Sequence, residues 1–308
     1  MRHVVRKQTD ANPSNLKMNI NRLFIILALT LLCVSGCSTV TLGYNHADWI
    51  LRYWINDYTS FSASQKEQIH LEVDNYLRWH RKNALPGYIA FLQSVDASVN
   101  QPGGTTIGDV MRLRDESGRL YQMTVEPMIP PTAHILSTLN SQQITELADT
   151  FAERNRKQRK KMLHGSKQEM LDDRAERHVE FVEQLVGSLS SEQKKKITEM
   201  SLRIPFASGA FVEQREAKHA RLITLLRNKA GEDQIAALFR QWMTAPDTYR
   251  TPEQQQIVAA YENAMNEMTV RLDQLLTARQ RHHLSEEITS YIQEFRKLNA
   301  KAEAVTIK

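Results

Sequence analysis

Apolar residues recur every three or four positions along most of this chain, rather than at every second position. The clearest run lies near the C-terminus, where such steps join Val258, Tyr261, Met265, Met268, Leu272 and Leu275 and resume with Leu284, Ile288, Tyr291, Phe295 and Leu298. This spacing puts apolar side chains on one face of a helix, and its heptad form is typical of helices that pack against neighbours. With only 11 Gly and 9 Pro in 308 residues, the pattern predicts an all-α, multi-helix bundle-like fold.

The breaks between these segments define the expected elements. Helices are predicted over residues 44–58, 62–84, 86–99, 105–124, 131–138, 141–163, 166–188, 190–202, 208–228, 232–244 and 252–298. The loosest linker is 100–105, which contains a proline and two glycines, followed by 126–131 and 203–209. None is long enough to separate domains, so we expect a single helical domain over 44–300, with a subdivision near 203–209 as the alternative.

A short pattern recurs at four places: an apolar residue, a capping residue, two spacers and Gln. The copies occupy residues 61–65, 139–143, 189–193 and 276–280. In a capping box the cap side chain accepts a backbone N–H and the Gln side chain reaches back to the cap N–H, so a generic helix start accounts for the pattern. The last copy, Leu-Thr-Ala-Arg-Gln, also resembles the motif of the periplasmic stress chaperones Spy and CpxP. The copies are too unevenly spaced for a solenoid repeat.

The first 36 residues have the features of an export signal. Basic residues precede the apolar segment 23–32, which is too short to remain as a membrane span, and Val34-Ser35-Gly36-Cys37 follows. Met18 is the favoured start, because it leaves a short basic region. This end resembles the lipobox of bacterial lipoproteins. The resemblance implies removal of residues 1–36 as a signal peptide and a lipid such as palmitate on Cys37, with residues 37–43 as a lipidated tether.

The same resemblance predicts where the protein lies in the cell. Ser38, rather than Asp, follows Cys37. Under the usual sorting rule for lipoproteins of Gram-negative bacteria, this implies anchoring on the periplasmic face of the outer membrane. The membrane is then a partner through the lipid anchor.

The net charge of +5 comes mostly from the export segment. Of the 40 Lys and Arg and the 35 Asp and Glu, five basic residues and one acidic residue precede Cys37, which leaves a net charge of +1. That balance gives no reason to expect nucleic acid as a partner. Both cysteines, Cys33 and Cys37, also belong to the export segment, so the rest of the chain is expected to fold without disulfides.

Aromatic residues are concentrated just after the predicted anchor. Residues 44–61 contain six of the 22 aromatics, among them Trp49, Tyr53 and Trp54. Because Trp and Tyr favour the headgroup region of a bilayer, these three are candidate interfacial residues. The alternative is that the first helix packs its aromatics into the core. Asp48 and Asp57 favour the core, because acidic side chains match anionic lipid poorly.

The densest basic run lies near the end of a predicted helix. It consists of Arg154, Arg156, Lys157, Arg159, Lys160 and Lys161. Cations at this end oppose the negative pole of the helix dipole and need no ligand. The alternative is a patch for anionic ligands, such as lipid phosphates or acidic segments of other proteins.

Metal and catalytic motifs are weak. Glu67-x-x-His70 and Glu216-x-x-His219 have the spacing used in di-iron bundles, but two such pairs are unremarkable in a chain of this composition. No HExxH, phosphate loop, nucleophile elbow or Cys–His pair occurs. We therefore expect no cofactor, no metal and no enzymatic activity.

Several segments together resemble a family of uncharacterised bacterial lipoproteins, of the domain of unknown function 6279 type. These are Tyr44 to Trp49, Asp57-Tyr58, Gln65, Trp79-His80-Arg81, Leu85 to Tyr88, Glu126-Pro127, Leu139 to Gln143 and Glu153-Arg154-Asn155. The Trp-His-Arg segment is the most specific. The resemblance implies a lipid-anchored helical envelope protein and brings no catalytic residues.

Three functions remain open at this point. The first is a non-enzymatic protein that binds unfolded or assembling envelope proteins. The second is a structural tether or adaptor for one specific envelope partner, and the third is an enzyme. An exposed, concave apolar surface flanked by basic residues favours the first, whereas a flat, self-complementary or peptidoglycan-facing surface favours the second. The oligomeric state is left open by the sequence.

Overall fold

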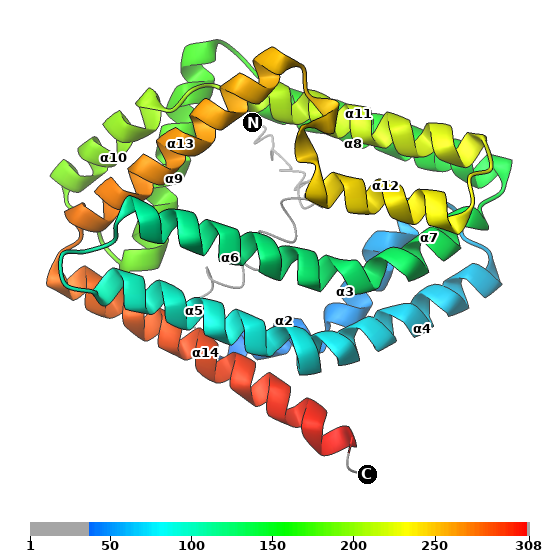
Figure 1. The fold of residues 1–308 in the computed structure, drawn as a ribbon, viewed down its shortest axis with the longest axis horizontal. Coiled ribbons are helices and arrows are strands. Elements are labelled where there is room, and N and C mark those ends of the chain that lie inside the picture. The colour runs from blue at the N-terminus through cyan, green and yellow to red at the C-terminus, as the bar shows by residue number, and fades with distance from the viewer. Residues whose placement is uncertain (1–36, 307–308) are drawn as a thin grey trace, which may run out of the picture.

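The computed structural model describes residues 37–306, with side chains from residue 40 to residue 300. The predicted signal peptide, 1–36, and its start at Met18 lie outside these residues. Every regular element within the described part is helical, and no strand occurs there (Figure 1). The predicted all-α class is confirmed. No helix of the described part is long and apolar enough to cross a membrane.

The elements follow one another with short connections. In chain order they are α2 (Cys37–Asn45), α3 (Ala47–Asn56), α4 (Ala63–Trp79), the π-helix η1 (His80–Ala84), α5 (Leu85–Asn100), α6 (Ile107–Val125), the 3-10 turn η2 (Glu126–Met128), α7 (Ile129–Ser137), α8 (Ser141–Met162), α9 (Lys167–Val186), α10 (Ser191–Arg203), α11 (Ser208–Arg227), α12 (Glu232–Thr244), the 3-10 turn η3 (Pro246–Tyr249), α13 (Pro252–Leu275) and α14 (Ala278–Thr306).

Several expected boundaries differ from the structure. The linker expected at 126–131 lies in η2 and the start of α7. The single helix predicted over 252–298 is wrong, because α13 ends at Leu275 and α14 begins at Ala278, with Thr277 as its cap. The heptad spacing continues through this corner, so periodicity alone hides the break. At the other end, residues 37–43, expected as a tether, lie in α2.

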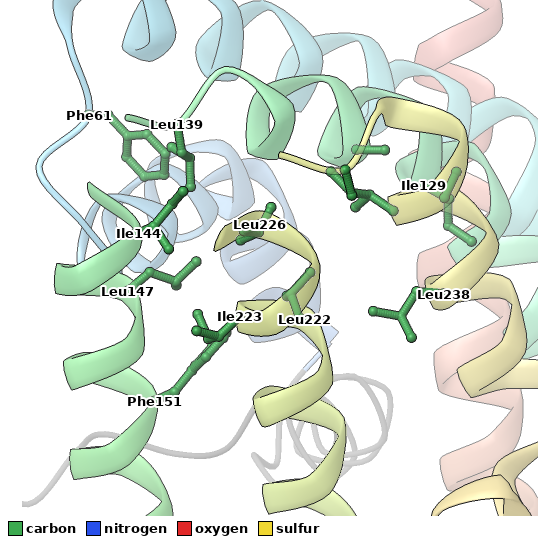
Figure 2. Packing of buried hydrophobic residues seen from close by; sticks show 14 of the residues in the cluster. Phe61, Ile129, Leu139, Ile144, Leu147, Phe151, Leu222, Ile223, Leu226 and Leu238 are labelled. Atoms are coloured by element: carbon green, nitrogen blue, oxygen red, sulfur yellow. The ribbon is translucent and has the colours of Figure 1, made fainter. Parts of the chain in front are cut away.

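The largest hydrophobic core joins α4, α7, α8, α11 and α12. Figure 2 shows Leu147 and Phe151 of α8 facing Leu222, Ile223 and Leu226 of α11. Phe61 and Leu139, the apolar residues of two capping patterns, belong to the same core. A second core joins α9, α10, α13 and α14, and the corresponding Leu189 and Leu276 pack against it. Each pattern therefore places its apolar residue in a core, as a hydrophobic staple does.

The helix contacts follow an approximate two-fold relation between the two halves of the chain. Helix α5 packs along α14 as α8 packs along α11, and α6 contacts α13 as α12 contacts α7 (Figure 1). The pairs α3–α4 and α9–α10, and likewise α4–α7 and α10–α13, match in the same way. Matching α3 to α8 with α9 to α14 in order satisfies all these pairs. Each half therefore packs its helices on helices of the other half.

The four capping patterns meet in two pairs, which we call the clasps. In the first clasp, Gln143 Nε2 donates to Gln65 Oε1 at 2.7 Å and to Ser60 O at 3.0 Å, while Gln65 Nε2 donates to Thr138 O at 3.2 Å. Each glutamine thus binds the carbonyl two residues before the other's cap.

The second clasp repeats this geometry in the other half. Gln193 Nε2 donates to Gln280 Oε1 at 2.8 Å and to Leu275 O at 2.9 Å, and Gln280 Nε2 donates to Ser188 O at 2.9 Å. The four patterns are therefore helix starts, as predicted, and also two matched contacts between distant segments. The uneven spacing along the chain reflects this pairing.

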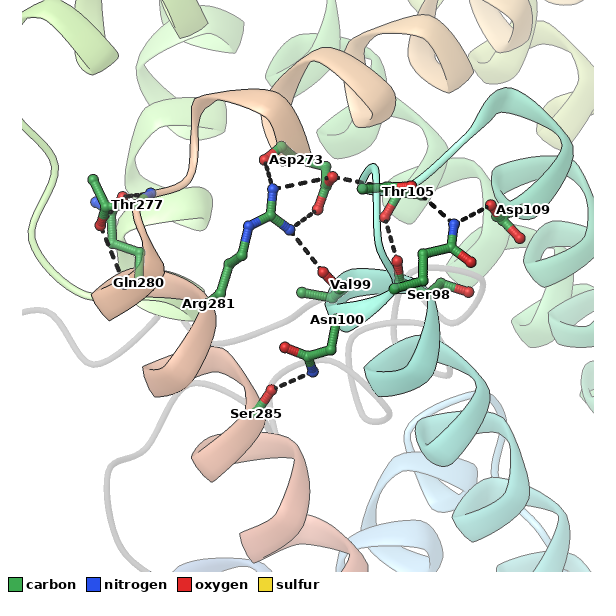
Figure 3. A network of polar contacts seen from close by, with 12 residues as sticks. Ser98, Val99, Asn100, Thr105, Asp109, Asp273, Thr277, Gln280, Arg281 and Ser285 are labelled. Atoms are coloured by element: carbon green, nitrogen blue, oxygen red, sulfur yellow. Dashed lines mark hydrogen bonds and ion pairs between the residues drawn. The ribbon is translucent and has the colours of Figure 1, made fainter.

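The linker predicted as loosest, 100–105, is in fact fixed at the α13–α14 corner (Figure 3). The buried Asp273 carboxylate accepts the Thr105 N–H at 2.8 Å and pairs with Arg281, whose guanidinium also donates to Val99 O at 2.8 Å. Gly104, at φ +76°, lies so close that a Cβ would stand 2.6 Å from Asp273 Oδ2. Gly104, which from the sequence suggested a flexible linker, instead lets the Asp273 carboxylate approach the backbone closely.

Candidate functional site

The Trp79-His80-Arg81 segment lies where the helix of α4 widens into η1 before it becomes α5. The Leu85 N–H donates to His80 O, a π-type bond, and Pro86 follows with no N–H to give. Asn299 Nδ2, from α14, donates instead to Arg81 O at 2.8 Å and to Lys82 O at 3.4 Å. A side chain of the other half thus donates to the carbonyls that face the position where Pro86 has no N–H. Single-turn π segments of this kind are frequent at functional sites.

Three tyrosines surround His80, and we call His80, Tyr44, Tyr76 and Tyr88 the His80 joint. The Tyr44 hydroxyl lies 2.6 Å from His80 Nδ1, and the three tyrosine rings have their centroids 5.6 to 5.7 Å from the imidazole. The hydroxyls of Tyr76 and Tyr88 bind O and Oγ1 of buried Thr124 at 3.2 and 3.1 Å. The joint therefore connects α2, α4, α5 and α6.

Burial controls the protonation of the His80 joint. It lowers the pKa of His80 to about 4, with the nearby Arg81 guanidinium acting in the same direction. It raises the pKa of all three tyrosines above their usual value. At neutral pH the four groups are uncharged. The joint is thus arranged to hold helix α2 on the body through Tyr44, and the Arg81 guanidinium completes this contact 5.1 Å from the Tyr44 ring centre.

A second cluster brings together Asp57-Tyr58 and Arg154-Asn155, two segments singled out from the sequence. Arg154 binds Asp57 at 2.8 Å, and its guanidinium lies 3.8 Å from the Tyr58 ring centre. Arg215 donates to Asn155 Oδ1 at 3.0 Å. This cluster fixes the end of α3 to α8 and α11.

A polar hollow of about 450 Å³ opens beside this cluster. Its lining includes Asp57, Lys66 and Glu146. Glu146 accepts hydrogen bonds from Ser60 N at 2.8 Å and Thr59 Oγ1 at 2.9 Å, which hold its pKa at about 2. The carboxylate is therefore used to fix the loop at the first clasp.

The predicted basic run is divided by the structure. Besides Arg154, Arg159 is engaged, because it binds Glu216 through two nitrogens at 2.6 and 3.0 Å, and Lys157 pairs with Glu153. Arg156, Lys160 and Lys161 are exposed. Three of the six cations are therefore paired with carboxylates, and binding of an anionic ligand by this run stays a prediction.

The predicted interfacial aromatics also divide. Trp49 and Tyr53 are 65% and 55% exposed and stack with ring centroids 5.8 Å apart, whereas Trp54 is half-buried. Tyr44, Tyr58 and Phe61 face the body. The expectation that the whole group packs into the core is therefore wrong for Trp49 and Tyr53.

Of the two Glu–His pairs, Glu67 and His70 are exposed, and Glu216 and His219 contact other residues. Glu216 binds Arg159, and His219 stacks on Phe151 with ring centroids 4.0 Å apart. Within residues 37–306, no three His, Cys, Asp or Glu side chains gather in a way that would hold a metal ion. The Cys37 side chain lies outside the described part.

Sequence reasoning missed the partners that complete these clusters. Tyr76, Thr124 and Asn299 carry no motif of their own. A usable signal was Pro86 after an uninterrupted helical pattern, because a proline there leaves a carbonyl that needs another donor. Which residue supplies that donor is set by the packing of α14 on α5, far away in sequence.

The fold and the His80 joint define an all-helical protein with two interlocked halves. A family of unknown function (DUF6279) matches residues 57–253, more than half of the chain, and the chain belongs to this family. The resemblance seen in the sequence is confirmed, and Trp79-His80-Arg81 lies within the match, whereas Tyr44 to Trp49 precede it. No curated protein and no solved structure matches the chain. The likeness to the chaperones Spy and CpxP rests on the local cap pattern alone.

Proposed function

We propose that this protein is a non-enzymatic, lipid-anchored helical envelope protein that binds unfolded or assembling envelope proteins. In this proposal Cys37 carries the lipid and holds the protein on the periplasmic face of the outer membrane.

One observation carries the client-binding part of the proposal: three large apolar residues exposed on one side of α6. Ile107, Met111 and Tyr121 are all exposed, and at helical spacing they fall on the same side as Gly118 and Arg114, whose guanidinium pairs with Glu262 of α13. We call these three residues the α6 stripe. Exposed apolar side chains that line up on one helix are suited to bind the apolar segments that unfolded chains expose.

The experiment measures how well the lipid-free chain suppresses aggregation of an unfolded envelope protein. We expect suppression by the wild type at several-fold molar excess and its loss in the double variant Ile107→Ser, Met111→Ser. Ile257→Ser, which changes an exposed apolar residue on α13, is the matched control and should retain suppression. A wild type that suppresses nothing would exclude general client binding.

The basic run is tested in the same assay. Changing Arg156, Lys160 and Lys161 to Gln leaves the three engaged cations in place, so the fold is spared. We expect weaker, less salt-sensitive suppression if these cations attract acidic clients. Equal suppression by wild type and variant would keep client binding and remove the basic run from it.

The second candidate is a structural tether for a specific envelope partner. The His80 joint favours it, because the joint fixes the predicted anchor helix to the body and so gives the whole molecule a set position at the membrane. Photo-crosslinking in cells from Met111 separates the two candidates. A single recovered partner indicates the tether, and a broad set of envelope proteins indicates client binding.

A further inference from the structure

Helices α2 and α3 form an almost continuous arm with one face turned to solvent. His46 joins them, because its N–H donates to Leu42 O at 3.3 Å and its O accepts from Ile50 N at 3.2 Å. At helical spacing, the exposed residues of the arm fall on one line, which we call the outer stripe. It consists of Leu42, Asn45, His46, Trp49, Tyr53 and Asn56.

The outer stripe contains no Asp, Glu, Lys or Arg, and Leu42, with 59% exposure, joins Trp49 and Tyr53 as its large apolar residues. The exposed face of α8, by contrast, is dominated by acidic and basic residues. The two acids that argued against membrane contact are engaged, Asp48 with Arg52 at 3.9 Å and Asp57 with Arg154 at 2.8 Å. An arginine therefore balances the charge of each carboxylate, which reduces the repulsion from anionic lipid that the sequence suggested.

The opposite face of the arm is attached to the body at several points. Tyr44 binds His80, Arg52 pairs with Asp74, and Thr41 donates to Glu294 of α14. Leu51 and Ile55 pack on the main core. The outer stripe therefore has a fixed orientation relative to the rest of the molecule.

We propose that the outer stripe lies in the headgroup region of a phospholipid bilayer and sets the orientation of the body on that membrane. Trp and Tyr are favoured at this depth because each combines an apolar ring with a polar N–H or O–H. Leu42 stands five residues after Cys37, so a lipid on Cys37 brings the stripe to the bilayer surface. The inference deepens the proposed function and rests on its lipid anchor, but not on client binding.

The small apolar area of the outer stripe favours a bilayer over a protein partner. A stable protein interface buries about 800 Å² on each side and has a packed apolar centre. Three large apolar side chains in a single line cover only a small part of such an area. A protein that a lipid already holds at the bilayer needs only a small apolar contact area to orient itself there, and three side chains supply it.

The test uses the full lipid-anchored protein in vesicles of zwitterionic and anionic phospholipid with bromine near the headgroup end of the acyl chains, which quenches tryptophan on contact. The chain has four tryptophans, at 49, 54, 79 and 242. We expect partial quenching of the wild type and a loss of most of that quenching in Trp49→Phe. Trp242→Phe, on α12, is the matched control and should keep the quenching.

Flotation of the protein with the vesicles is measured in the same samples and reports the lipid anchor separately. Flotation without quenching, or quenching that survives in Trp49→Phe, overturns the outer stripe as a membrane surface while the anchor stands. Quenching in a protein that mass spectrometry shows to lack a lipid on Cys37 supports the stripe and overturns the anchor. Absence of both flotation and quenching overturns both. Client binding is read only in the aggregation assay.

Discussion

Each clasp glutamine uses both ends of its side-chain amide. Gln143 Oε1 accepts the N–H of its own cap, Asn140, at 3.0 Å, while Nε2 donates across to the other helix start. Gln280 does the same from its cap, Thr277, at 3.0 Å. A glutamate would serve the capping box equally well but has no donor for the crossing bond. The choice of Gln at all four positions is therefore explained by the clasp.

Changing Gln143 or Gln280 to Glu is expected to destabilise the protein by about 2 kcal/mol or more, because each change buries a carboxylate and leaves a carbonyl without its donor. Urea unfolding followed by circular dichroism measures the effect. The control is Glu169→Gln in the Ser166 capping box of α9, where the change should stay within about 0.5 kcal/mol. An equal loss of stability in the clasp variants and in Glu169→Gln would show that the clasp hydrogen bonds add no stability beyond that of the capping boxes.

His219 gives a pH prediction. Burial lowers its pKa to about 3, helped by Arg215, and its Nδ1 has no hydrogen-bond partner among the described residues. Since the unfolded chain takes up this proton near pH 6.5 and the folded one does not, stability is complete above pH 6.5 and falls as the pH drops toward 3.

His219→Phe keeps the stack on Phe151 and removes the titrating group. We expect equal or greater stability at pH 7 and a shallower loss between pH 6.5 and 4.5, by up to about 1.4 kcal/mol per pH unit. Unfolding midpoints across that range measure it. His80→Phe should also flatten the profile but lower stability at pH 7, because it removes the partner of Tyr44. An unchanged slope in His219→Phe would contradict the buried neutral state.

Among the helical elements, the α5–α6 connection allows a matched comparison of two neighbouring glycines. Both have positive φ, +89° at Gly103 and +76° at Gly104, but only Gly104 has Asp273 against the site of a Cβ. Gly103→Ala should cost about 1 kcal/mol of backbone strain. Gly104→Ala should cost at least about 2 kcal/mol more, because it also disturbs the buried Asp273–Arg281 pair. Similar losses in thermal or urea unfolding would show that the close contact is not important.

The elements also show how far sequence reasoning reaches. The three-to-four spacing located most helices, because it records which face is buried. It did not find the corner at Thr277, because the apolar spacing continues on both sides of it. It also did not find η1, because one extra residue in a single turn barely changes the apolar spacing. The clasps and Asn299 were missed for a different reason: they join residues that only the tertiary fold brings together.

For the whole molecule, the interlocked halves make α14 essential. It packs along α5, contacts α2 and α9, and supplies Gln280 to the second clasp and Asn299 to η1. A chain that ends at residue 276 should therefore lose the fold throughout, with no cooperative unfolding transition. A chain that ends at residue 300 keeps these contacts and should unfold close to the wild type. A stable fold of residues 37–276 would contradict the interlocking.

The same packing sets an order of events when the chain is delivered from one end, by a ribosome or through a membrane pore. The first clasp needs residues only up to Gln143, so it can form early. Helix α5, however, packs on α14, and α8 packs on α11. Both partners emerge later than the helices that they cover. Contacts between such distant segments close slowly. The N-terminal half is thus expected to keep apolar faces exposed until α11 and α12 complete the main core and, at α5, until α14 arrives, and it would itself need protection from aggregation in that interval.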